Sequence, residues 1–198
     1  MELTFTHRLA EKISEISVMP AVSLKLLCAN SREQQLFKGQ TLLKEGQVCR
    51  NIYFIESGQL RTYYLKNGKE INLNFTFENN FLTNLKSFLS GAPSEYYVRA
   101  SEPTVVWKFN KDQVLSLYRQ SCEIESFGRK LVEQLLIRQE DHNNLFKLYN
   151  PSERYHYVAK YHPKLLQRVS LTQLASYLGI SRETISRIRR GAPSFLGV

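Results

Sequence analysis

Cysteine, histidine and long apolar runs are scarce in this chain of 198 residues, and each scarcity excludes a class of protein. Its three cysteines, Cys28, Cys49 and Cys122, are too scattered for a C-x-x-C zinc site, and an odd number does not suit a disulfide framework. No segment approaches the roughly 18 apolar residues of a membrane span, and charged residues interrupt the N-terminus where a secretory signal needs an apolar core. We therefore expect a cytoplasmic protein with no membrane partner.

Acidic residues are outnumbered by basic ones, with 18 Asp/Glu against 27 Lys/Arg and a formal net charge of +9. The excess is uneven, because residues 150–198 contain eight Lys/Arg and only two Asp/Glu. Hydrophobic and charged contents of 42% and 23% are typical of a globular protein. The concentration of positive charge near the C-terminus predicts a phosphate-rich partner whose binding weakens with salt.

Residues 170–190 have the pattern of a helix-turn-helix, which makes double-stranded DNA the expected partner. Ser170 and Gln173 fit a capping box at the start of the first helix. Gly179 supplies the tight turn, and Ser181 can cap the second helix.

The polar face of the second helix carries the residues that we expect to contact DNA. Ile185 and Ile188 share its buried face, and Gly191 followed by Pro193 ends it. The expected base-reading residues are Arg182, Glu183, Ser186 and Arg187. Arginine can donate two hydrogen bonds to guanine, and glutamate can accept one from cytosine. The alternative is that these residues form only solvated ion pairs within the helix.

Short runs of aromatic and aliphatic residues, punctuated by glycine, extend from about residue 34 to residue 109. They predict strands at 51–56, 59–66 and 69–77, joined by Ser57-Gly58 and Asn67-Gly68. Regularly spaced short strands indicate a small antiparallel barrel or jelly roll. Residues 4–19 have the apolar spacing of an amphipathic helix that packs on it.

Helical spacing then continues through residues 112–149, with no proline and no internal cap. We interpret its apolar stripe as the seam of a homodimer, with packing against the chain's own barrel as the alternative. The stripe consists of Ile124, Phe127, Leu131, Leu135 and Leu145. Asn150-Pro151 ends this helix, marks a hinge and starts a further helix to about residue 161.

The pattern predicts an α+β chain in three parts. Residues 1–111 form a sensor, residues 112–149 a long dimerisation helix, and residues 150–198 the DNA-binding domain.

This order of elements, with Ser181-Arg-Glu-Thr-Ile-Ser-Arg187 in the second helix, resembles the Crp/Fnr family of bacterial transcription regulators over nearly the whole chain. The resemblance implies a cyclic-nucleotide-binding-like β-roll and a winged helix-turn-helix. It also implies a half-site related to TGTGA or TTGAT. In relatives, hydroxyls matching Ser170, Thr172 and Ser181 contact phosphate. We expect Arg189 and Arg190, at the end of the second helix, to contact phosphate as well.

The sensor departs from the family pattern where cyclic AMP would bind. Family members place a glycine and a glutamate after a hydrophobic pair, and an Arg-Ser pair further on. Here Phe81-Leu82 is followed by Thr83-Asn84, and the later pair is Ser94-Glu95. A carboxylate near the phosphate position would repel it, although Arg61 or Arg99 offers an alternative anion site. Cyclic AMP is therefore disfavoured. The candidate effector pocket comprises Leu82, Thr83, Asn84, Ser94 and Glu95.

Other cofactors lack ligands in this sequence. An iron–sulfur sensor needs four cysteines, and the four histidines lie outside the expected barrel, which disfavours haem and a metal-dependent jelly-roll enzyme. We expect no cofactor, no metal and no catalysis.

The predicted function is a homodimeric transcription regulator that reads a palindromic site, with an effector that the sequence does not identify and RNA polymerase as a further candidate partner. Two alternatives remain open. One is a cyclic-nucleotide-responsive regulator with a non-standard pocket, and the other is a module whose helix-turn-helix contacts protein.

Overall fold

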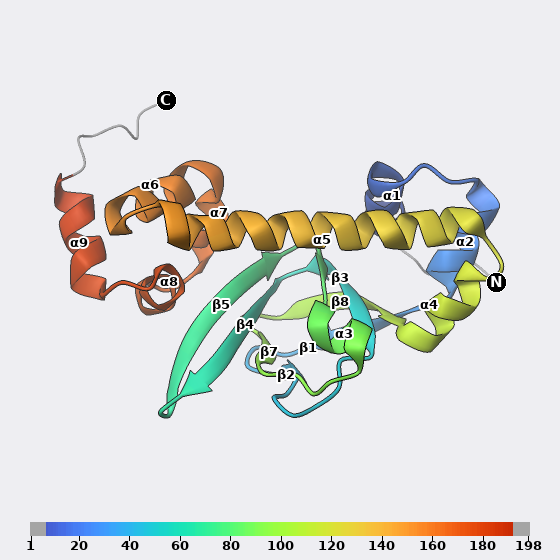
Figure 1. Ribbon diagram of the computed structural model, residues 1–198, viewed down its shortest axis with the longest axis horizontal. Coiled ribbons are helices and arrows are strands. Elements are labelled where there is room, and N and C mark those ends of the chain that lie inside the picture. Colours follow the sequence, from blue (N-terminus) through green and yellow to red (C-terminus); the bar gives the residue numbers. More distant parts are fainter. Residues whose placement is uncertain (1–6, 192–198) are drawn as a thin grey trace.

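In the computed structural model, which describes residues 7–191, one long helix lies along a β-roll and connects two helical groups (Figure 1). This helix, α5 (Cys122–Leu148), runs the length of the molecule. The β-roll packs against one side of it. The C-terminal helices gather at one end of α5, and α1, α2 and α4 gather at the other.

The β-roll consists of two four-stranded antiparallel sheets, as expected. One has the order β1-β8-β3-β6 and the other the order β2-β7-β4-β5. The strands are β1 (Ser31–Leu36), β2 (Thr41–Leu43), β3 (Asn51–Ser57), β4 (Gln59–Lys66), β5 (Lys69–Phe77), β6 (Phe81–Leu82), β7 (Tyr97–Ala100) and β8 (Thr104–Asn110). The three strands predicted from the sequence, β3, β4 and β5, are confirmed to within one residue.

Two turns position the predicted strands. Asn67 and Gly68 both have positive φ, 51° and 72°, which is the backbone of a tight hairpin that matches strand twist. Gly58 has φ +88°, and a Cβ there would lie 2.5 Å from the Pro103 carbonyl oxygen. Only glycine fits at that crossing from β3 to β4.

The helices before and within the sensor differ in part from the sequence expectation. The N-terminal helix α1 (His7–Ile16) is shorter than the predicted 4–19, and residues 1–6 lie outside the described part. Two further helices, α2 (Ala21–Ala29) and α3 (Leu85–Ser90), were not predicted. No helix among residues 7–191 is long and apolar enough to cross a membrane.

The predicted helix over 112–149 is wrong in one respect, because it is two helices. α4 (Lys111–Tyr118) ends before α5 begins, and the Ser121 hydroxyl caps α5 by accepting a hydrogen bond from the Ile124 amide at 3.3 Å. The sequence pattern does not reveal that the Ser121 side chain takes the place of a backbone carbonyl as the acceptor, so the break between the two helices was not predicted.

The interpretation of the apolar stripe as a dimer seam is also wrong. Ile124, Phe127 and Leu131 are buried in the sensor core, Leu135 packs against that core, and Leu145 is buried with the C-terminal helices. The alternative that the stripe packs within its own chain is the one the structure shows. Leu136, Ile137 and Leu148 point elsewhere and are 52%, 59% and 72% exposed.

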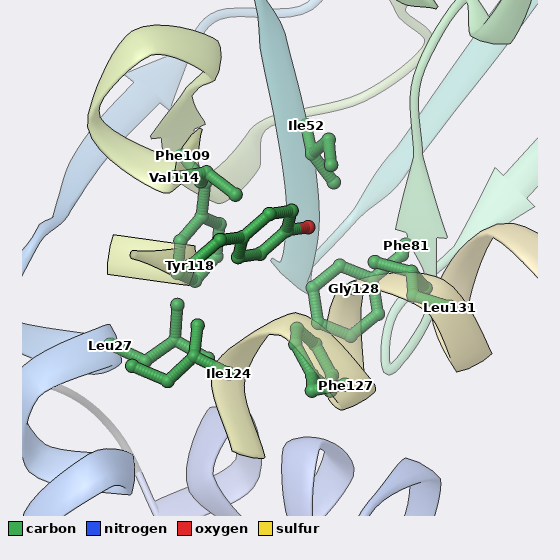
Figure 2. A pocket seen from close by; sticks show the side chains of 10 residues that line it. All are labelled: Leu27, Ile52, Phe81, Phe109, Val114, Tyr118, Ile124, Phe127, Gly128 and Leu131. Atoms are coloured by element: carbon green, nitrogen blue, oxygen red, sulfur yellow. The ribbon is translucent and has the colours of Figure 1, made fainter. Parts of the chain in front are cut away.

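The N-terminal half of α5 is seated on the β-roll through a close contact with α4. Figure 2 shows the ring of Tyr118 beside Gly128, among apolar side chains of the sensor core. A Cβ at Gly128 would lie 1.7 Å from the Tyr118 hydroxyl oxygen. Glycine therefore allows the ring to pack against the helix backbone.

The C-terminal group contains α6 (Pro151–Tyr161), α7 (Pro163–Arg168), α8 (Leu171–Leu178) and α9 (Arg182–Gly191). Asn150 caps α6 in a capping box with Glu153, and Pro151 occupies the first turn. The predicted end of the long helix before Asn150 and the predicted helix to residue 161 are confirmed, and the hinge itself stays a prediction. The expected wing and Pro193 fall in residues 192–198, outside the described part.

Candidate DNA-binding interface and sensor groove

The helix-turn-helix forms as the sequence predicts. The Ser170 hydroxyl accepts a hydrogen bond from the Gln173 amide at 3.3 Å, and the Gln173 side chain accepts one in return from the Ser170 amide. Gly179 ends α8 in the left-handed conformation with φ 65°. The Ser181 hydroxyl then accepts a bond from the Thr184 amide at 3.1 Å. These local bonds set the angle at which α9 leaves α8.

The face of α9 follows the predicted division between core and solvent. Ile185 is fully buried in the cluster that α6, α7 and α8 share, whereas Arg182, Glu183 and Arg187 are exposed. Ser186 is half-buried. Burying Ile185 fixes the rotation of the helix, so the three charged side chains project away from the domain.

Glu183 is held in its ionised form. A hydrogen bond from its own backbone amide and one from Ser181 lower its pKa, and the nearby Arg182 and Arg187 lower it further. A carboxylate that stays charged can only accept hydrogen bonds, and cytosine N4 is a donor in the major groove.

The candidate phosphate contacts are not all equally free. Ser170, Thr172 and Ser181 are exposed at the starts of α8 and α9. Arg189 instead turns back, since its Nε donates to the Tyr155 hydroxyl at 2.9 Å and its guanidinium lies 5.8 Å from that ring. This side chain braces α9 against α6, and the phosphate contact expected of Arg189 stays a prediction.

Arg190 is also engaged within its own helix. Its Nε donates to the Ser186 carbonyl at 3.3 Å. It remains an exposed cation at the end of α9.

The candidate effector pocket is largely satisfied by its own hydrogen bonds. Asn84 and Ser94 are 3% and 2% exposed, and the Asn84 side-chain amide donates to the Ser94 hydroxyl at 2.8 Å. The Asn84 side-chain oxygen caps α3 by accepting a hydrogen bond from the Ser87 amide, and the Ser94 hydroxyl donates to the Tyr96 carbonyl. Asn84 and Ser94 thus join two segments of the sensor and present no free polar group to a ligand.

The other three residues of the predicted pocket, Leu82, Thr83 and Glu95, differ in burial and in hydrogen bonding. Leu82 is buried in the barrel core, and the Thr83 hydroxyl donates to the Asn51 carbonyl at 2.9 Å. Glu95 is exposed and paired with Lys86. The carboxylate is therefore neutralised by a neighbour, and the cassette carries no unpaired positive charge for a phosphate.

The two arginines considered as an alternative anion site do not serve the cassette. Arg61 is 6% exposed and binds Glu70 at 2.6 Å and Asn72 at 3.1 Å. Arg99 reaches the same carboxylate at 3.4 Å, and both guanidinium groups stack on the Tyr63 ring. Their charge is used to hold β4, β5 and β7 together.

A groove of about 1160 Å³ runs from the cassette to the C-terminal helices. One side is formed by the sensor, including Thr83 and Glu95, and the other by α5 and by aromatic residues such as Tyr157 and Tyr177. The groove also contains His142, whose pKa is lowered by burial and by the nearby His162. His142 thus lies at the junction of α5 and α8, within 3.3 Å of the Tyr177 hydroxyl.

A direct contact between sensor and helix-turn-helix was not predicted. The Asn72 amide on β5 donates to the Ser176 hydroxyl on α8 at 3.0 Å, and Phe75 meets the Tyr177 ring edge-on. Four charged residues reinforce it, namely Glu78, Glu102, Lys164 and Arg168. Sequence separations of 66 to 90 residues leave no local signal from which these pairs could be inferred.

The described residues thus form a two-sheet β-roll, a long connecting helix and a capped helix-turn-helix. Residues 33–121 match the cyclic nucleotide-binding domain family. No curated protein sequence matches the chain significantly.

Solved structures share the arrangement over most of the chain. FixK2 from Bradyrhizobium japonicum is 20% identical, with a TM-score of 0.66 over 85% of this chain and 89% of its own. The catabolite activator protein of Thermus thermophilus is 20% identical, with a TM-score of 0.58 over 90% and 85%. A protein from Eubacterium rectale described as a Crp/Fnr family transcriptional regulator is 19% identical, with a TM-score of 0.63 over 87% and 82%. The α+β fold class is confirmed, and this chain shares the fold of these three proteins.

Proposed function

We propose that this chain is a sequence-specific DNA-binding transcription regulator that acts as a homodimer on a palindromic site. The observation that carries the proposal is the face of α9, where Arg182, Glu183 and Arg187 project into solvent while Ile185 anchors the helix in the core. Arginine and ionised glutamate are the side chains that discriminate base pairs in the major groove. The basic C-terminal quarter supports binding to the phosphate backbone.

The dimer is supported by the solvent-exposed side of α5. Leu136 and Ile137 form a small exposed apolar patch near the middle of α5, and Leu148 is exposed at its C-terminal end. Pairing of two such helices would bury this patch. Two readers on one dimer would then meet half-sites about one DNA turn apart.

The sensor is proposed to work without cyclic AMP. Asn84 and Ser94 satisfy one another, and the Glu95 carboxylate pairs with Lys86, so that this cation is already occupied. We propose no metal, haem or iron–sulfur cofactor and no catalytic role. Any effector would occupy the groove beside Thr83 and Glu95.

The test is the variant Arg187→Ala, compared with wild type on a selected DNA site and on random duplex at one salt concentration. One bidentate arginine–guanine contact is worth about 1–3 kcal/mol of discrimination, and a dimer makes it twice. We expect the preference for the selected site to fall to near unity, while circular dichroism shows an unchanged fold. Arg32→Ala removes an exposed arginine from β1 and is the matched control. Unchanged specificity in Arg187→Ala would refute base reading by α9.

A further inference from the structure

The helix-turn-helix contacts the sensor directly, because strand β5 packs against it. The Asn72 amide donates to the Ser176 hydroxyl, and the Asn72 side chain donates to the Gln173 carbonyl at 3.4 Å. The Phe75 ring joins the buried cluster of the C-terminal helices. These contacts hold α8 in one position relative to the β-roll.

Ion pairs close the edge of this contact at α7. Glu78 follows β5 and binds Lys164 at 2.5 Å and Arg168 at 2.6 Å. Arg168 also pairs with Glu102, and its guanidinium lies 5.0 Å from the Phe77 ring. We call Glu78 and Glu102 the acidic latch. Both side chains are only 25% and 34% exposed, so water and salt screen these pairs less than ordinary surface pairs.

The cations that the latch holds lie beside the expected DNA contact. Arg168 is two residues before Ser170, whose hydroxyl caps the start of α8. A helix N-terminus directed at a phosphate brings the residues just before it close to the same backbone. Lys164 and Arg168 are two of the eight basic residues in the C-terminal quarter. Among residues 7–191, the ion pairs of Lys164 and Arg168 are all made with sensor carboxylates.

We propose that the acidic latch is an autoinhibitory contact in which sensor carboxylates occupy Lys164 and Arg168, two further phosphate-binding residues of the DNA interface. This inference rests on the proposed DNA-binding function. The DNA backbone and the latch compete for the same two cations. Because phosphate contacts dominate non-specific affinity, occupation of these cations lowers binding before any base is read.

The experiment measures binding of a random-sequence duplex to Glu78→Gln/Glu102→Gln across a series of salt concentrations. We expect tighter binding than wild type. The slope of log affinity against log salt should steepen by roughly one unit for each freed cation. Glutamine keeps the length and shape of each side chain, removes its charge and replaces one of its two acceptor oxygens with an amide donor. The single variant Glu102→Gln leaves both cations paired with Glu78 and should keep a slope close to that of wild type.

The control variant must remove the same two negative charges elsewhere. Glu11→Gln/Glu15→Gln does so on α1, at the opposite end of α5 from the C-terminal helices (Figure 1). It should retain the wild-type slope. If the latch variant matches this control, or binds DNA more weakly than wild type, the proposal is wrong, and in the second case the latch only orients the reader.

A second measurement separates the latch from the function on which it rests. Amide hydrogen exchange at Asn72 reports the contact with Ser176 in the absence of DNA and should speed up in the latch variant. Unchanged exchange overturns the latch whatever the DNA result. Loss of discrimination in Arg187→Ala concerns base reading alone and is independent of both latch measurements.

Discussion

Replacing Gly128 with alanine tests whether the seat of α5 on the sensor depends on the close approach of Tyr118. The added Cβ would lie 1.7 Å from the Tyr118 hydroxyl oxygen and 2.4 Å from Cζ, far inside van der Waals contact. The ring must move, yet it is packed against the sensor core. Overpacking of this kind costs about 1–3 kcal/mol. Alanine returns up to about 1 kcal/mol through its higher helix propensity.

The net expectation for Gly128→Ala is a loss of about 1–2 kcal/mol in the free energy of unfolding. For a chain of this size, this lowers the melting temperature by about 2–8 °C. Urea unfolding followed by circular dichroism measures the free energy, and a calorimetric scan measures the temperature.

A double-mutant cycle with Tyr118→Leu identifies the cause. Leucine removes the ring atoms that the new Cβ would meet, so alanine at position 128 should be nearly neutral or stabilising in that background. If Gly128→Ala stabilises the otherwise unaltered protein, or if the two changes are simply additive, the steric argument is refuted.

Two further predictions concern the latch and the dimer. Burial alone would raise the pKa of Glu78, but its bonds with Lys164 and Arg168 lower the pKa to about 2. Because the pKa is lowered on folding, ionised Glu78 stabilises the fold fully above pH 4.5, and this stabilisation is lost as the pH falls toward 2. Glu78→Gln should therefore destabilise the protein by up to about 3 kcal/mol at pH 7. The destabilisation should become progressively smaller between pH 4.5 and 2. A stability difference that stays constant with pH in urea unfolding contradicts this assignment. Leu136→Glu/Ile137→Glu should shift the protein from dimer to monomer in analytical ultracentrifugation, because it places charge in the proposed α5 seam. Leu115→Glu, at an exposed position on α4, should leave the mass unchanged, and an unaltered dimer in the first variant would place the seam elsewhere.

The interaction of Asn84 with Ser94 changes how the sensor is understood. From the sequence, the cassette lacks an arginine and therefore lacks a counter-charge for phosphate. In the folded protein the same region is also closed by hydrogen bonds, so restoring one arginine would not restore a pocket. A ligand that uses the groove must make its contacts on the exposed side, near Glu95 and α5.

Much of the helix-turn-helix was predictable because local hydrogen bonds and turns determine it. The Ser170 capping box, the left-handed Gly179 and the cap at Ser181 each depend on residues within four positions of one another. The rotation of α9 also follows from local periodicity, which places Ile185 inward. Such features depend only on short segments of the chain, so they can be predicted without knowledge of the tertiary structure.

The face of α5 that turns inward was not predictable in the same way. Apolar residues lie on more than one side of this helix, and their spacing alone does not decide which side meets a partner. Only the position of the β-roll decides that Phe127 and Leu131 are covered by the same chain while Leu136 and Ile137 are left exposed. The break at Ser121 is similarly decided by where α4 packs.

The sequence by itself determined the strands β3 to β5, the break between α5 and α6 at Asn150 and the exposed face of α9, because short-range caps, turns and periodicity specify them. The tertiary structure decided which strip of α5 is buried, how Asn84 closes the cassette, and that Glu78 meets Arg168 across 90 residues. These features depend on contacts between segments far apart in the chain, and such contacts exist only once the fold has brought the segments together.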